Sequence, residues 1–139
     1  MQQARRIYVT EFDRVRLEDL LAAAEAFGEA AWQELEPLAA ELDRAEVVSS
    51  REVPADVVTM NSRVRLRDLA SEREMTYALV FPRDANVEAG AISILAPIGT
   101  ALLGYARGDV VEWRVPSGLR RLRIEEVVYQ PEAAGDFHL

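Results

Sequence analysis

The stretch TEFDRVRLEDLLAAAEAFG, residues 10–28, decides the N-terminal half of the fold. Thr10 is a favourable N-cap residue, and Glu11 and Asp13 follow in the first turn, where acids complement the helix dipole. Apolar residues then recur at steps of three and four, the spacing of one helical face: Leu17, Leu20, Ala24 and Phe27. We therefore expect a helix that ends near Gly28.

A second apolar stripe follows at the same spacing and consists of Ala31, Leu35, Leu38, Leu42 and Ala45. Two such stripes joined by a short glycine-containing link predict a coiled-coil-type antiparallel helical hairpin. Pro37 lies inside the second stripe, where a proline removes a backbone hydrogen bond and costs about 3 kcal/mol. We therefore expect the ordered second helix to begin at Pro37. Arms of about 10–17 residues would reach only ~15–25 Å.

Residues 27–36 would then form an irregular tip, with Trp32 as its apolar anchor and three acids around it, Glu29, Glu34 and Glu36. One or two such carboxylates with waters can hold Mg²⁺, but acid-rich helices are also ordinary solvated faces. The sequence leaves both readings of the tip open.

Acidic residues are concentrated in the helical region. The chain has 139 residues and a net charge of −8, from 24 acids and 16 bases, and every base is arginine. Residues 11–46 hold eleven acids and three arginines, a net of −8, whereas the rest of the chain holds thirteen of each and is neutral. This balance disfavours nucleic acid and favours a partner with a basic surface, although a solvated helical face would carry the same charge.

After a connector that ends at Pro54, the composition changes to β-type segments. The expected strands cover residues 57–60, 63–69, 75–81, 92–95, 110–115 and 119–129, with one short helix over 98–103 that ends at Gly104. Arg63, Arg65 and Arg67 alternate with apolar residues and predict a half-buried strand with an arginine face. The fold class is thus α+β, with a hairpin domain over 1–50 and a mainly antiparallel sheet domain over 51–139, of which residues 129–139 form a tail.

The residue types exclude most catalytic chemistry. There is no cysteine and no lysine, and the one histidine, His138, lies next to the end of the sequence. Thiolates, Schiff bases, histidine triads and histidine-ligated metals are therefore excluded, and no phosphate-binding glycine loop occurs. We expect no catalytic residue, no metal and no cofactor. No apolar run reaches the ~20 residues of a membrane helix and no signal peptide is present, so we expect no membrane association and a cytoplasmic location.

Four segments resemble a known family. DVVTMNSRV (56–64) and ISILAPIGTALLG (92–104), with Gly108-Asp109 after it, resemble the C-terminal domain of the Gre transcription factors. Within that family, ELDRA (41–45) and YQPEAAGD (129–136) resemble the Rnk branch, the regulators of nucleoside diphosphate kinase. The resemblance covers nearly the whole chain.

This resemblance implies an FKBP-like fold for the second domain and RNA polymerase as the partner. In Gre factors the C-terminal domain grips the rim of the secondary channel, while the coiled coil enters it and two tip acids help to hold a catalytic Mg²⁺. Carried over, the rim contact would consist of Leu95, Ala96, Pro97, Ile98 and Leu103. The hairpin is about half as long as a Gre coil, so we expect competition with Gre factors without transcript cleavage, and an indirect effect on nucleoside diphosphate kinase.

Two alternatives stay open. The acidic hairpin would also suit a protein-binding adaptor unrelated to polymerase. The FKBP-like fold suggests a prolyl isomerase, but fold alone does not carry function, and the aromatic residues of the second domain, Tyr77, Phe81, Tyr105 and Trp113, are dispersed. The arginine face would meet either acidic polymerase surface or solvent. We expect a monomer without direct sequence-specific contact to nucleic acid.

Overall fold

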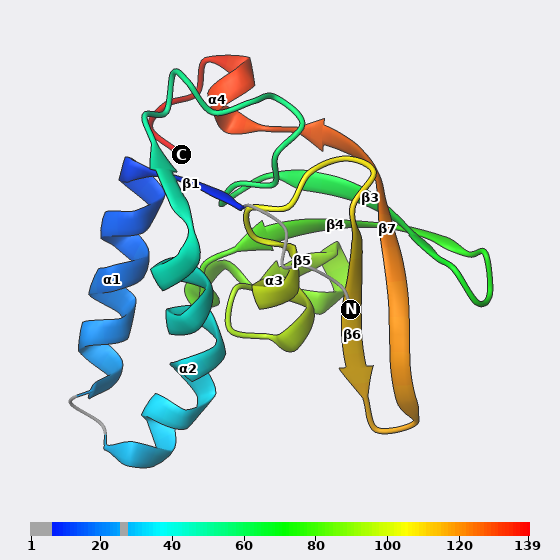
Figure 1. Ribbon diagram of the computed structural model, residues 1–139, viewed down its shortest axis with the longest axis horizontal. Helices are drawn as coiled ribbons and strands as arrows, with labels where there is room; N and C mark the ends of the chain where they lie inside the picture. The colour runs from blue at the N-terminus through cyan, green and yellow to red at the C-terminus, as the bar shows by residue number, and fades with distance from the viewer. Residues whose placement is uncertain (1–6, 26–27) are drawn as a thin grey trace.

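The N-terminal part of the protein is a helical hairpin of α1 (Glu11–Glu25) and α2 (Glu29–Arg44) (Figure 1). The structure, a computed structural model, describes residues 7–25 and 28–139, without the side chains of 25, 29–32, 34 and 113–115. The predicted N-cap is confirmed, because Thr10 Oγ1 accepts a hydrogen bond of 3.0 Å from the backbone N–H of Asp13.

The prediction that the second helix begins at Pro37 is wrong. Helix α2 starts at Glu29 and runs through Pro37, which lies exposed on its surface. Leu35, Leu38 and Leu42 are all buried on the opposite face. Burying one such side chain contributes about 1.5–3 kcal/mol, so three of them together outweigh the ~3 kcal/mol cost of an interior proline. Glu36 therefore lies exposed in a regular helix and not in an irregular tip.

A small parallel sheet closes the base of the hairpin. Strand β1 (Tyr8–Thr10) precedes α1, β2 (Glu46–Val48) follows α2, and the two pair in parallel. The short β-branched and aromatic run of residues 6–9 is compatible in sequence with either a strand or an entry arm, and the structure forms a strand over Tyr8–Thr10; β2 was not predicted. The two helices thus return the chain to its starting edge.

The second part is a five-stranded sheet in the order β5-β4-β3-β7-β6. Its strands are β3 (Arg63–Asp68), β4 (Glu74–Val80), β5 (Ala91–Ser93), β6 (Val110–Val115) and β7 (Gly118–Tyr129). The α+β class is confirmed, and β4, β3, β7 and β6 pair antiparallel as expected. Strand β5 differs, because it pairs parallel to β4. The intervening loop, with the 3₁₀ turns η1 (Pro82–Asp84) and η2 (Val87–Ala89), carries the chain back before β5 begins.

Residues 57–60 do not form the expected strand, although Val57, Val58 and Met60 are buried. Their backbone groups are satisfied individually and not by a ladder. The N–H of Val58 donates to the carbonyl of Tyr105 at 2.8 Å, and the N–H of Met60 donates to Asp13 Oδ2 at 3.0 Å. The segment is therefore a buried loop, held by hydrogen bonds to one backbone carbonyl and to one side chain.

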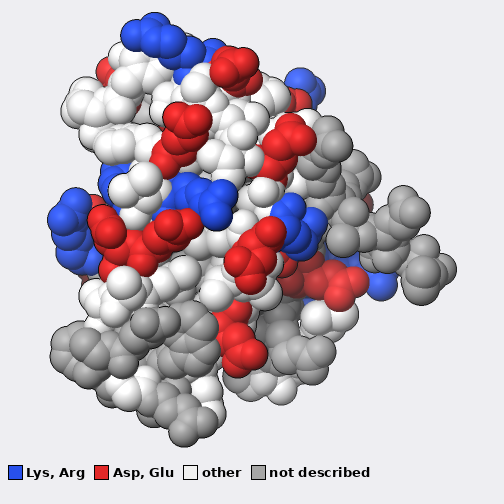
Figure 2. Space-filling model, turned by 60° about the vertical axis from the view of Figure 1, so that its left-hand side comes forward, with Lys and Arg blue, Asp and Glu red and all other residues white. Residues whose placement is uncertain are grey.

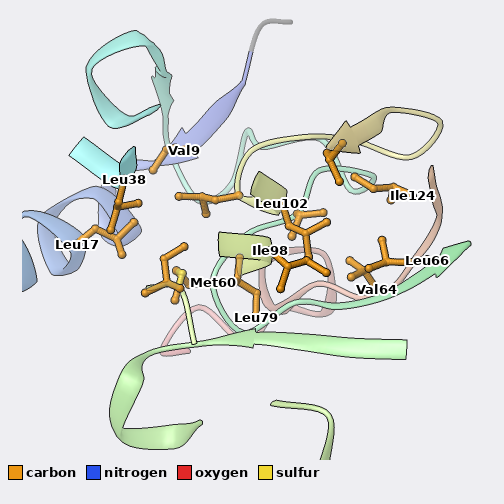
Figure 3. Close-up of a cluster of buried hydrophobic side chains, with 14 of the residues drawn as sticks. Val9, Leu17, Leu38, Met60, Val64, Leu66, Leu79, Ile98, Leu102 and Ile124 are labelled. Atoms are coloured by element: carbon orange, nitrogen blue, oxygen red, sulfur yellow. The ribbon is translucent and has the colours of Figure 1, made fainter. Parts of the chain in front are cut away.

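One hydrophobic core joins the hairpin to the sheet domain (Figure 3). Val9, Leu17 and Leu38 contribute from the hairpin side, and residues such as Met60, Leu79, Ile98 and Leu102 contribute from the other. Each of these side chains is at most 3% exposed. The hairpin is consequently packed against the sheet domain along the part that carries these residues.

The tail that follows β7 is ordered. Helix α4 (Pro131–Ala134) begins after Gln130, whose Nε2 donates to the carbonyls of Pro54 and Val57 at 2.7 and 2.8 Å. Buried Glu132 accepts a hydrogen bond of 2.7 Å from the hydroxyl of Thr59. The tail therefore helps to fix the 54–60 loop, next to the hydrogen bond that Asp13 accepts from Met60.

Candidate functional site

The turn between β5 and α3 (Pro97–Leu102) presents a small apolar surface. Pro97 is exposed, and Leu95 and Ala96 before it are partly exposed. Ile98 and Leu103 are only 3% and 1% exposed and belong to the core. Of the five residues predicted to contact a partner, the structure thus brings Leu95, Ala96 and Pro97 to the surface and places Ile98 and Leu103 beneath them.

Local contacts hold this turn rigidly. Ser93 Oγ accepts a hydrogen bond of 3.0 Å from the N–H of Leu95, and the hydroxyl of Thr100 donates to the carbonyl of Ile94 at 2.7 Å. Gly99 packs directly on the strand, where an added Cβ would lie 2.2 Å from the carbonyl oxygen of Ser93. Glycine is therefore required for α3 to approach β5 this closely, and the exposed turn rests on a fixed support.

The arginine face of β3 exists, and Arg65 and Arg67 on it are paired with acids of the sheet. Arg65 lies 3.4 Å from Glu74 and 3.1 Å from Glu126, and Arg67 lies 2.7 Å from Glu125 and 3.2 Å from Glu74. Surface pairs of this kind contribute about 0–1 kcal/mol each, so they add little to the stability of the fold. A partner that bound Arg65 or Arg67 would have to replace their ion pairs with Glu74, Glu125 and Glu126.

The hairpin tip lies largely outside the described residues. The side chains of Glu29, Trp32 and Glu34 are not among them, and Glu36 is exposed on α2. Helices of 15 and 16 residues correspond to lengths of about 22–24 Å at 1.5 Å per residue. This agrees with the short reach predicted from the sequence. In the described part of the chain, no group of three or more acid or histidine side chains is arranged to hold a metal ion.

Asp13 links the hairpin to the sheet domain through its buried carboxylate. The sequence analysis identified it only as an acid in the first turn of a helix. Asp13 is 0% exposed, and its Oδ2 accepts the hydrogen bond from the N–H of Met60, while Oδ1 accepts from Arg16 Nη2 at 2.5 Å. Burial raises the pKa of Asp13 to about 6, against the opposing effects of the Met60 N–H and of Arg16. Its position four residues before Leu17 puts it on the buried stripe, which is the signal that could have revealed it.

The aromatic residues that an isomerase pocket would need do not converge. Phe81 lines a groove beside α1, whereas Tyr77 lines a separate polar pocket near Asp68. The hydroxyl of Tyr105 accepts a hydrogen bond of 2.6 Å from Arg44. Tyr77 and Phe81 thus line different pockets, and the side chain of Trp113 lies outside the described residues. Among the described helices, none is long and apolar enough to cross a membrane.

Comparison with known families agrees with this geometry. The family described as "Transcription elongation factor, GreA/GreB, C-term" matches residues 53–129, and the family described as "Rnk N-terminus" matches residues 5–48. The chain belongs to the GreA/GreB family, in its Rnk branch. The resemblance seen in the sequence is thereby confirmed.

This member of the family is 41% identical over 134 residues to the regulator of nucleoside diphosphate kinase from Escherichia coli (strain K12), which covers 96% of each chain. It is 38% identical over 96 residues to the transcription elongation factor GreA from Desulfotalea psychrophila, covering 69% of this chain and 56% of that protein. Among solved structures, it resembles "Prokaryotic transcription elongation factor GreA/GreB from Nitrosomonas europaea" with a TM-score of 0.73 and 45% identity, over 91% of this chain and 100% of that one. These relatives are regulators or transcription factors, and this Rnk-branch chain is a Gre-related transcription factor.

Proposed function

We propose that this protein binds RNA polymerase at the rim of the secondary channel and competes there with Gre-type elongation factors without stimulating transcript cleavage. Its effect on nucleoside diphosphate kinase is then an indirect consequence of altered transcription. Membership of the GreA/GreB family supports polymerase as the partner. The charge of −8 over residues 11–46 suits a basic protein surface better than nucleic acid.

The observation that carries this proposal is the exposed apolar turn of Leu95, Ala96 and Pro97. Interfaces gain most of their binding energy from a few anchors that enter a pocket on the partner. A rigid anchor loses little conformational freedom on binding, and this turn is fixed by the close approach of Gly99 to β5. Ile98 and Leu103 act as positioning residues, because they pack in the core below the turn.

The absence of cleavage follows from the length and packing of the hairpin. Its helices are only about 22–24 Å long. Part of that length is used in packing on the sheet domain, because Leu17, Leu38 and Leu42 enter the shared core. We therefore expect the remaining part to be too short to carry tip acids from the rim of the channel to the active centre of the polymerase.

Displacement of a fluorescently labelled Gre factor from core RNA polymerase tests the proposal. Pro97→Asp keeps an acid-tolerant first helical position but removes the apolar anchor, so we expect it to weaken competition about tenfold or more. Val87→Asp is the matched control, because Val87 is 83% exposed on another loop, and it should compete as well as the wild type.

Three results would contradict the proposal. Failure to displace the Gre factor at about 10 µM, against the micromolar range of moderate complexes, would favour an adaptor for another protein. Binding to polymerase without displacement would place the contact away from the rim. Equal loss in both variants would show that Pro97 has no specific part in binding.

A further inference from the structure

Residues 49–62 join the hairpin to the sheet domain, between the end of β2 and the start of β3. We call this segment the connector. Residues 130–139, the tail that follows β7, lie along the connector and contact it from Arg51 at one end to Asn61 at the other (Figure 1). Neither segment belongs to the β5–α3 turn, so this contact is separate from the proposed polymerase surface.

The side chain of Gln130 forms the centre of this contact and is only 4% exposed. Its Nε2 donates to the carbonyls of Pro54 and Val57 at 2.7 and 2.8 Å, and its Oε1 accepts a hydrogen bond of 3.1 Å from the N–H of Ala133. Both amide protons and the amide oxygen thus have partners. One side chain therefore binds the connector and caps the first turn of α4 at the same time.

A buried loop of the connector joins the tail to the hairpin. The hydroxyl of Thr59 donates to Glu132 of the tail at 2.7 Å and lies 2.8 Å from the hydroxyl of Ser62. Met60, the next residue, donates its N–H to Asp13 of α1 at 3.0 Å. The side chains of Thr59, Ser62 and Asp13 lie in residues that are at most 1% exposed. The tail and the hairpin therefore bind neighbouring residues of the same buried loop.

The two ends of the connector are also attached. The guanidinium of Arg51 lies 4.6 Å from the ring centre of Phe137. Asn61 Nδ2 donates to the carbonyl of Leu139 at 2.6 Å, and the backbone N–H of Asn61 donates to the carbonyl of Leu79 in β4 at 2.6 Å. Asn61 thus bonds to the tail and to the sheet domain together.

Electrostatic repulsion opposes this closed arrangement. Residues 11–46 carry a net charge of −8, the connector holds two acids and one arginine, and the tail holds two acids and no arginine. Figure 2 turns the hairpin side forward and shows acidic side chains spread over this face, with basic ones beside some of them. Burial, and to a smaller extent the charge of Glu132 across the connector, raise the pKa of Asp13 to about 6. The contacts of the tail therefore hold together segments of like charge.

We propose that the tail is a clamp on the connector, and that the hairpin, the connector and the tail open together as one unit while the five-stranded sheet stays folded. The hydrogen bonds of Gln130, Glu132 and Asp13 all end on residues 54–60, so movement of the hairpin away from the sheet breaks bonds of the tail. Proteins open in cooperative units of this kind. The clamp is a property of the free protein and stands independently of polymerase binding.

Native-state hydrogen exchange of the ¹⁵N-labelled full chain, followed by NMR in low concentrations of urea, tests the proposal. Protected amides of α2 and the hydrogen-bonded amides of residues 134–136 should share one opening free energy and one urea dependence. Their opening should be at least about tenfold more populated than that of β3 and β7 amides. Raising NaCl from about 0.02 to 0.5 M should protect this unit more than the sheet, because it screens the repulsion.

Variants of the tail contact provide the second arm. Gln130→Ala removes the bonds to Pro54 and Val57 and should lower the protection of α2 amides about tenfold or more. Gln33→Ala is the matched control, because Gln33 is exposed on α2 itself, and it should change the same amides by less than about twofold. If Gln130→Ala does not fold, Arg51→Ala removes only the contact with Phe137 and should lower their protection about threefold.

Four results would overturn the proposal. Different opening free energies for α2 and the tail would show that they open separately. Exchange of α2 together with β3 and β7 would show that no separate unit exists. Unchanged protection of α2 in the folded tail variant, or equal effects of Gln130→Ala and Gln33→Ala, would show that the tail does not hold the hairpin.

Discussion

Replacing Asp13 by asparagine perturbs the polar link between the hairpin and the sheet domain without changing its shape. The amide oxygen of an asparagine at this position can still accept the hydrogen bond that Met60 N–H donates to Asp13 in the native protein, but the side chain cannot ionise. The charged form of Asp13 is stabilised by Arg16 and by the Met60 N–H, yet desolvation is the largest effect and raises its pKa to about 6. The difference between the two proteins should therefore depend on pH.

The sign and size follow from proton linkage. The pKa of Asp13 rises from 3.8 to about 6 on folding, so between these values the folded protein binds more protons than the unfolded chain. The resulting stabilisation is fully present below pH 3.8 and is lost as the pH rises through about 6. Between about pH 4 and pH 7.5 the wild type should lose about 2.5 kcal/mol of unfolding free energy relative to Asp13→Asn.

Urea unfolding of both proteins at these two pH values measures this difference, and the effects of acids that do not interact with Asp13 cancel between them. Asp19→Asn, which removes an exposed acid of the same helix, should shift stability by less than about 0.5 kcal/mol at either pH. A difference between wild type and Asp13→Asn that stays constant within about 0.5 kcal/mol would refute the reasoning. So would a wild type that gains relative stability as the pH rises, because its pairing with Arg16 would then outweigh burial.

Three further changes test the packing by urea unfolding. Gly99→Ala should destabilise by about 3 kcal/mol or more, since its Cβ would meet the carbonyl of Ser93 at 2.2 Å; a neutral effect would mean that α3 can move away freely. Pro37→Ala should stabilise by up to about 3 kcal/mol because it restores a donor inside α2, and a loss of stability would show that the helix needs the proline. Leu102→Ala should cost about 2–5 kcal/mol and Val87→Ala less than about 0.5 kcal/mol; similar values for the two would contradict the assigned core.

Periodicity and local chemistry predicted the parts of the fold in which neighbouring residues decide the structure. Thr10 caps α1 as expected, Leu17, Leu38 and Leu42 lie on buried faces, and the alternation around Arg65 identified β3. In each case the residues that form the sequence pattern are also the ones that cap the helix or lie on its buried face or in the strand. Such elements are visible in a single sequence.

Contacts between distant segments account for what the sequence did not show. Pro37 alone predicted a helix start, but the free energy gained by burying Leu35, Leu38 and Leu42 allows the helix to continue through it. The apolar run around Val58 reads as a strand, yet its backbone bonds go to Tyr105 and to the side chain of Asp13. Asp13 and Met60 are 47 residues apart in the sequence, and no local pattern indicates that they meet.

The candidate contact at the β5–α3 turn stays a prediction, and burial shows which of its residues are accessible. The apolar string from Leu95 to Ile98 predicted a contact at this turn, but spacing alone does not tell which residues face solvent in a helix of six residues. The structure separates exposed Pro97 from buried Ile98 and Leu103. The groove that Leu20 of α1 and Phe81 both line was not anticipated, because these residues are far apart in the sequence.

Transcript cleavage in a backtracked elongation complex tests the central claim most directly. The purified protein, titrated alone, should produce no cleavage, and added together with a Gre factor it should suppress the cleavage that the factor stimulates. Pro97→Asp should lose this suppression, while Val87→Asp should retain it. Cleavage stimulated by the protein alone, or Gre-stimulated cleavage that persists at saturating concentrations of the protein, would contradict the account.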